Sequence, residues 1–115
     1  MSFEWVIVDT ETTGLQNPIH IIEIAAQRMR GFNAVGQPFH AYLNHSVRIP
    51  AEAIAVHGLT QSFIHRKGLD PRKVHSDFEQ YLENRPFAAH NLSYDLKCIN
   101  TERRRLGFNT ELSGE

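Results

Sequence analysis

The stretch that decides the fold is Val6-Ile7-Val8-Asp9-Thr10-Glu11-Thr12-Thr13-Gly14. Its first part is apolar and β-branched, which is typical of a buried strand, and a turn-forming Thr-Thr-Gly follows. Side chains alternate between the faces of a strand, so Asp9 and Glu11 point the same way, roughly 6.5–7 Å apart. Two such carboxylates repel each other and lose hydration unless a cation neutralises them. Oxygen ligands at this spacing suit Mg²⁺ or Mn²⁺, although an exposed strand end with two solvated acids explains the spacing equally well.

Length and composition predict a single globular domain. The chain has 115 residues, of which 41% are hydrophobic and 22% are charged. Its net charge of −1 lacks the overall basic footprint of a nucleic-acid binder, for which a local basic patch or a bound metal would have to compensate. The single cysteine, Cys98, excludes an internal disulfide and fits a reducing compartment, so we expect a cytoplasmic location and a small apolar packing role for Cys98. We expect no signal peptide and no membrane-spanning segment.

The first half of the chain predicts three consecutive antiparallel strands. Residues 4–10 read as a central strand with cover on both faces, because Trp5-Val6-Ile7-Val8 is continuously apolar. Residues 19–30 and 37–44 read as two further strands that form a hairpin around a loop bounded by glycines.

The second half predicts helices, because capping residues precede periodic apolar positions. A short apolar strand over 87–91 interrupts them, and the whole order predicts an α/β layered domain. The expected helix starts and ends are Pro50 and Gly58, Thr60 and His65, Asp70 and Asn84, and Ser93 and Gly107.

A third acid, Asp95, lies one turn into the last helix. If the fourth strand lies beside the first, Asp95 reaches the same end of the sheet as Asp9 and Glu11. Alone, Asp95 is better explained as an acid that stabilises a helix N-terminus. Together with the upstream pair it favours a metal site.

The remaining polar candidates give weaker signals. None of the seven histidines has the paired spacing of a zinc site, and we expect most of them at the surface or half-buried. His57 stands beside Gly58, where a side chain can meet a ligand, although an ordinary histidine at a helix C-terminus has the same position. The run Arg103-Arg104-Arg105 suits phosphate contact, but we prefer a solvated helix face that balances Glu102, opposite a buried stripe. The expected stripe is Leu92, Leu96, Ile99 and Leu106.

Four segments in order resemble the DEDD-type (DnaQ-like) 3′→5′ exonucleases, close to the proofreading epsilon subunits of bacterial replicative polymerases. Their order and spacing match over nearly all of the chain. The segments are Asp9-Thr10-Glu11-Thr12-Thr13-Gly14, Ile21-Ile22-Glu23-Ile24-Ala25, Val56-His57-Gly58-Leu59-Thr60 and Ala89-His90-Asn91-Leu92-Ser93-Tyr94-Asp95.

The resemblance implies a ribonuclease-H-like mixed sheet, with three antiparallel strands followed by parallel ones and flanking helices. It also implies two-metal hydrolysis of 3′-terminal phosphodiesters with Mg²⁺ or Mn²⁺, on single-stranded or frayed ends, with DNA favoured over RNA. Asp9, Glu11 and Asp95 match the catalytic metal ligands. The positions that match substrate contacts are Thr12, Thr13, Gly14, Leu15, His57, His90 and Asn91. Leu15 and Phe63 are candidate apolar surfaces for bases.

One family motif is absent. The family carries a later His-x₄-Asp that supplies the general base and a fourth metal ligand, but no aspartate follows Asp95 and no histidine follows His90. We therefore expect residues 1–115 to be the N-terminal portion of an exonuclease domain, without its last strand and third-motif helix, that binds metal weakly and catalyses poorly. The alternative is a catalytically inactive exonuclease-like module for binding or assembly. A polymerase subunit is the expected protein partner. The sequence leaves the oligomeric state open, with a dimer as one alternative.

Overall fold

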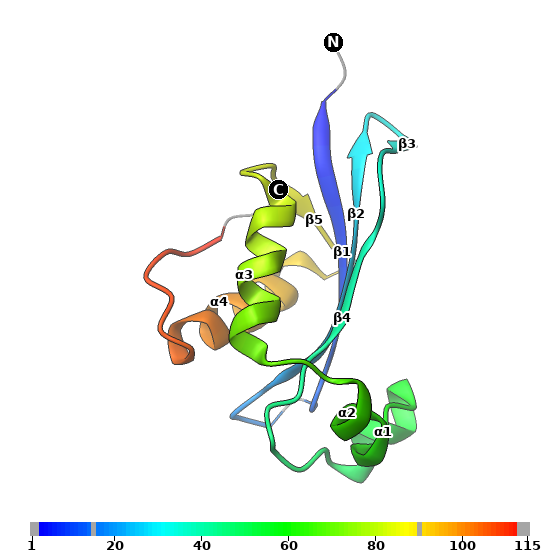
Figure 1. Cartoon of the computed structure of the whole chain (residues 1–115), viewed down its shortest axis with the longest axis vertical. Helices are drawn as coiled ribbons and strands as arrows, with labels where there is room; N and C mark the ends of the chain where they lie inside the picture. The colour runs from blue at the N-terminus through cyan, green and yellow to red at the C-terminus, as the bar shows by residue number, and fades with distance from the viewer. Residues whose placement is uncertain (1–2, 15, 90, 113–115) are drawn as a thin grey trace.

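The structure, a computed structural model, describes residues 3–14, 16–89 and 91–112. It confirms the expected α/β architecture, with a mixed sheet and flanking helices (Figure 1). The strands are β1 (Glu4–Thr12), β2 (Ile21–Arg30), β3 (Asn33–Ala34), β4 (Phe39–Tyr42) and β5 (Phe87–Ala88). The helices are α1 (Ala51–His57), α2 (Gln61–Lys67), α3 (Pro71–Leu82) and α4 (Leu92–Arg105).

Strand β1 occupies the middle of the sheet. It runs antiparallel to β2 along its whole length and parallel to β5, with Val6 opposite Phe87. This pairing confirms that the last described strand lies beside the first. Strands β3 and β4 both pair with the other edge of β2. The short strand β3 was not expected and lies within the glycine-bounded loop.

The main core lies on one face of this sheet. Val6 and Val8 of β1 are buried there against Val74 and Phe78 of α3, and Figure 1 shows α3 and α4 on this side. On the opposite face Ile7 is 47% exposed, so the expectation of cover on both faces is wrong for the described residues. The apolar run shows that β1 is central, but only the placement of the helices shows how many of its faces are covered.

Most of the helix boundaries lie where the capping residues of the sequence predicted them. Helix α1 ends at Gly58, which has a left-handed φ of 74°, and the Thr60 side chain accepts a hydrogen bond from Phe63 N at 3.1 Å at the start of α2. Asp70 caps α3 in the same way. Helices α1 and α2 lie beyond one end of the sheet (Figure 1) and contribute Ala53 and Ile64 to a second apolar cluster.

Helix α4 differs from the sequence expectation in two respects. Its N-cap is Asn91 rather than Ser93, and no side-chain hydrogen bond caps it. Among the expected apolar stripe only Ile99 is fully buried, whereas Glu102 and Arg103 are each 1% exposed. The predicted solvated face is therefore wrong at these two positions. Cys98 is buried among apolar residues, as expected.

The buried Glu102 joins three parts of the chain. Its carboxylate lies 2.6 Å from His75 Nε2 and 3.2 Å from His45 Nε2, and it accepts a hydrogen bond from Ile21 N at 2.8 Å. His75 is fully buried, unlike the surface or half-buried position expected of most histidines. Arg103 is similarly enclosed, with an ion pair to Glu79 at 2.6 Å. These partners offset the cost of burying the charges, while Nδ1 of His75 and Nη1 of Arg103 have no hydrogen-bond partner among the described residues.

None of the helices in the described part of the chain is long and apolar enough to cross a membrane.

Candidate functional site

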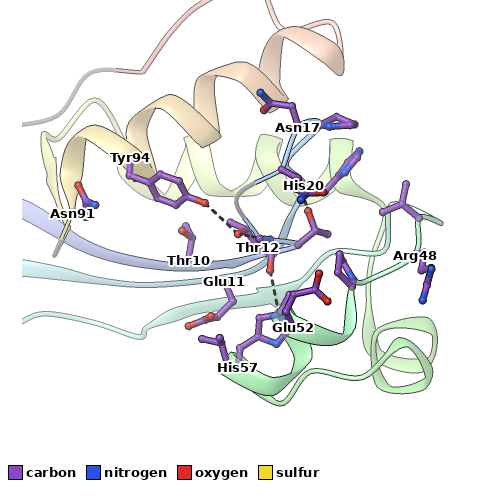
Figure 2. Close-up of a pocket in the computed structure, with 18 residues that line it drawn as sticks. Thr10, Glu11, Thr12, Asn17, His20, Arg48, Glu52, His57, Asn91 and Tyr94 are labelled. Atoms are coloured by element: carbon purple, nitrogen blue, oxygen red, sulfur yellow. Dashed lines mark hydrogen bonds between the residues drawn. The ribbon is translucent and has the colours of Figure 1, made fainter.

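A cavity of about 850 Å³ opens at the end of β1. Its walls come from the turn between β1 and β2, the loop before α1, α1 itself and the start of α4 (Figure 2). The register between β1 and β2 shifts between Glu11 and Thr12, at the edge of this cavity. The lining residues are Thr10, Glu11, Thr12, Thr13, Gly14, Gln16, Asn17, Pro18, His20, Val47, Arg48, Pro50, Glu52, Ala53, Val56, His57, Asn91 and Tyr94.

Of the three acids expected at a metal site, Glu11 lines the cavity directly. Burial raises the pKa of Glu11; the nearby charge of His57 lowers it, while the charges of Asp9, Glu23 and Asp95 add to the rise. Asp9 shares the Glu11 face of β1 and is exposed. The negative charges of Asp9 and Asp95 thus oppose ionisation of Glu11.

The side chain of Asp95 lies beside the other face of β1, the face that carries Thr10. Its side chain is buried, and Oδ1 accepts a hydrogen bond from Thr10 Oγ1 at 2.7 Å. Within residues 3–14, 16–89 and 91–112, no three acidic, histidine or cysteine side chains surround one common ion position. Asp9, Glu11 and Asp95 nevertheless offer only oxygen donors in a crowded acidic environment, which is the donor chemistry that Mg²⁺ and Mn²⁺ prefer.

The Thr-Thr-Gly turn divides its polar groups between the cavity and the fold. Thr12 Oγ1 accepts a hydrogen bond from Gly14 N at 3.1 Å and lies 3.4 Å from the Tyr94 hydroxyl (Figure 2). Thr13 is buried and closes the turn, because its hydroxyl accepts from His20 N and its N–H donates to His20 O. Gly14 has a φ of 115°, which side chains with a Cβ rarely adopt.

His57 is fixed at the cavity wall by both ring nitrogens. Nδ1 accepts a hydrogen bond from Leu59 N at 3.0 Å, and Nε2 lies 3.1 Å from the carbonyl oxygen of Thr12 (Figure 2). A carbonyl only accepts, so Nε2 carries the proton. A substrate that hydrogen-bonds to His57 must therefore displace one of these partners.

The remaining expected contacts are distributed unevenly. Asn91 lines the cavity and is exposed. Leu15 and His90 lie outside the described residues. Phe63 does not line the cavity, and its ring instead packs edge-on against Tyr42 with ring centroids 4.9 Å apart.

Sequence reasoning missed several residues of the cavity wall. Tyr94 stands next to Asp95 within a segment that carries the family resemblance, so that segment could have identified it; burial raises the pKa of its hydroxyl. His20 and Arg48 carry no local signal, because only the folded chain brings the β1–β2 turn and the loop before α1 together.

The chain matches a known protein family. The exonuclease family model RNase_T matches residues 6–113. The chain is 36% identical over 103 residues to the DNA polymerase III subunit epsilon of Rickettsia typhi and 35% identical to that of Rickettsia prowazekii. In both cases the alignment covers 88% of this chain but only 44% of the relative, so the chain spans less than half the length of these proteins.

The fold also matches solved structures. A product-bound exonuclease I superposes with a TM-score of 0.81 at 18% identity, covering 91% of this chain and 26% of that protein. This likeness confirms the ribonuclease-H-like fold. The chain therefore belongs to the exonuclease family, whose members are in general nucleases that depend on divalent metal ions.

Proposed function

We propose that this chain is the cavity-bearing part of an enzyme that removes nucleotides from the 3′ end of DNA. The observation that carries the proposal is Glu11, a carboxylate crowded by Asp9 on the same face of β1, at the wall of an open cavity in a chain of the exonuclease family. Such crowding is costly without cations, and phosphodiester cleavage requires cations at the reacting phosphate.

The proposed metal ligands are Asp9, Glu11 and Asp95, with Mg²⁺ or Mn²⁺ as the ion. When bound, such ions supply an activated water and offset negative charge on the phosphate. Thr10 holds the Asp95 carboxylate at 2.7 Å and so limits the orientations that this ligand can adopt. Binding is expected to require a small shift of these side chains toward one another.

The proposed substrate is a single-stranded or frayed 3′ end. The cavity walls carry apolar groups, among them Pro18, Val47 and Val56, that suit contact with an unpaired base. Thr12, Asn91 and the backbone of Gly14 supply polar groups for the terminal nucleotide, whereas the buried Thr13 would act by holding the turn. His57 would contact the 3′ end only after one of its present hydrogen bonds breaks.

Three broader proposals rest on the relatives. We place residues 1–115 as the N-terminal portion of an exonuclease domain whose third motif lies elsewhere. A polymerase subunit is the proposed partner, because the matched relatives are named as subunits of DNA polymerase III. The proposed location is the cytoplasm.

The deciding experiment measures metal binding and cleavage on the same preparation. Mn²⁺ is expected to raise the thermal midpoint of the chain, because an ion that binds only the native state stabilises it. The variant Glu11→Gln should lose this shift, while Glu111→Gln, the same change at an exposed residue outside the cavity, should keep it. A 5′-labelled single strand should shorten stepwise from its 3′ end, slowly because the third motif is absent.

The second candidate, an inactive binding module, is favoured by the lack of any histidine after His90 and any aspartate after Asp95. It predicts no Mn²⁺ shift and no shortening of the labelled strand. A Mn²⁺ shift that Glu11→Gln leaves intact would contradict the proposed ligand set.

A further inference from the structure

The loop that carries Arg48 is clamped on both sides of that residue. The side-chain amide of Gln61, at the start of α2, donates from Nε2 to Val47 O at 2.9 Å and accepts at Oε1 from Ile49 N at 2.8 Å. Ile49 itself is only 4% exposed and packs with Ile22 in the second apolar cluster. The backbone of Arg48 is therefore held in place from both neighbours.

The side chain of Arg48 is exposed and uncommitted. Among the described residues, its guanidinium has no hydrogen bond, ion pair or aromatic partner, whereas every other arginine has at least one of these. A rigid backbone beneath a free guanidinium is the arrangement expected of a residue that meets a ligand, because little ordering of the chain is needed on binding.

Arg48 also occupies a distinctive place in the cavity. It is the one lysine or arginine among the described lining residues. Figure 2 shows it at the opposite end of the cavity from Asn91 and Tyr94, with Glu11 and His57 between. Arg48 thus lies away from Tyr94, which directly precedes the proposed ligand Asp95 in the chain.

The chemistry of a 3′-terminal substrate identifies the group that this guanidinium would meet. The terminal nucleotide joins the strand through a single phosphate. That phosphate is the one cleaved, beside the proposed metal ligands. Any second phosphate in the cavity must therefore belong to the strand on the 5′ side. Guanidinium groups match phosphate oxygens in geometry and charge.

We propose that Arg48 binds a backbone phosphate of the substrate strand upstream of the terminal nucleotide. This inference rests on the proposed exonuclease function and adds a subsite to it. The contact would hold a strand with several nucleotides in the cavity while leaving the affinity for a mononucleotide unchanged. Glu52 also lines this cavity, and among the described residues it forms no ion pair with Arg48.

The test compares Arg48→Gln with Arg104→Gln in the full 115-residue chain. Arg104 is a matched control, since it loses the same charge but pairs with Glu111 and lies outside the cavity. Fluorescence anisotropy with 5′-labelled (dT)8, in Ca²⁺ to prevent turnover, gives the affinity at several salt concentrations. Competition by dTMP reports the terminal site alone, and thermal unfolding reports folding.

Arg48→Gln should weaken (dT)8 binding about fivefold at low salt, as expected for one exposed charged contact. The slope of log affinity against log salt should fall by about 0.7, the value for one phosphate of a single strand. Binding of dTMP and the thermal midpoint should not change. Equal effects of the two variants on (dT)8, or equal weakening of dTMP and (dT)8 by Arg48→Gln, would overturn the Arg48 contact. Wild-type chain that fails to bind (dT)8 would instead refute the proposed function.

Discussion

At the scale of single residues, the most consequential interaction lies outside the cavity. Glu102 connects α4 to His75 of α3, His45 of the loop after β4 and the first residue of β2, Ile21. Burial by itself would raise the pKa of Glu102, but the hydrogen bonds from His45 and His75 lower it to about 2. The native fold therefore favours the ionised form of this carboxyl group.

This network makes stability depend on acid pH. A carboxyl whose pKa is depressed in the native state contributes stability above its ordinary pKa of 4.5 and loses that contribution as pH falls toward 2. We expect the free energy of unfolding of the wild-type chain to fall by on the order of 3 kcal/mol between these limits on account of Glu102. Urea denaturation at a series of pH values measures this change.

Glu102→Gln should be less stable than wild type at pH 7, and its unfolding free energy should vary less over the same pH range. The charged and titratable groups around this carboxylate are His45, His75, His20 and Arg105. Glu111→Gln, at an exposed carboxyl, should retain the wild-type pH dependence. A variant at Glu102 with the full wild-type pH dependence would show that another group is responsible.

At the scale of elements, α2 depends on its N-cap residue, Thr60. The helix is short, and the Thr60 hydroxyl satisfies one of its free backbone N–H groups, that of Phe63. Thr60→Ala should lower the free energy of unfolding by about 1 kcal/mol. Thr60→Ser keeps the hydroxyl and should recover most of that loss in urea denaturation. Equal losses in both variants would mean that the methyl group, rather than the cap, stabilises α2.

The ends of α1, α2 and α3 explain why local signals predicted the elements well. Thr60, Gly58 and the Asp70-Pro71 pair act through backbone geometry and hydrogen bonds within a few residues, so the sequence contains all the information needed. Local signals did not predict the start of α4 or which of its side chains are buried. Its buried polar side is stabilised by His75 and His45, which no local pattern connects to Glu102.

At the scale of the whole molecule, Phe87 of β5 links the last part of the chain to the core. It is fully buried, opposite Val6 in the parallel pair, and its ring lies 6.3 Å from that of Phe78. Phe87→Ala should cost about 3–5 kcal/mol of unfolding free energy, a large share of the total of about 5–15 kcal/mol typical of a domain.

Phe32→Ala is the matched control, because Phe32 is 97% exposed and its loss should change stability by less than about 0.5 kcal/mol. Far-ultraviolet circular dichroism and Trp5 fluorescence should give coincident urea transitions in each variant, as expected of one cooperative domain. Similar costs for the two phenylalanines would contradict the central position of Phe87.

The sequence by itself was sufficient for the mixed α/β sheet, the central place of β1, the starts of α1, α2 and α3 and the four segments of the exonuclease family. Each depends on periodicity, on capping within a few residues or on motif spacing, which are properties of neighbouring positions. The acids Asp9, Glu11 and Asp95 were also identified as candidates in this way, and their role as metal ligands stays a prediction.

Only the tertiary structure decided how these parts meet. It placed Thr10 rather than Asp9 against Asp95, buried Glu102 and Arg103, left Ile7 exposed and brought Arg48 into the wall of the cavity. The physical reason is common to all four. Burial, charge pairing and cavity shape depend on groups that are distant in sequence, and their energies arise only when folding removes water between them.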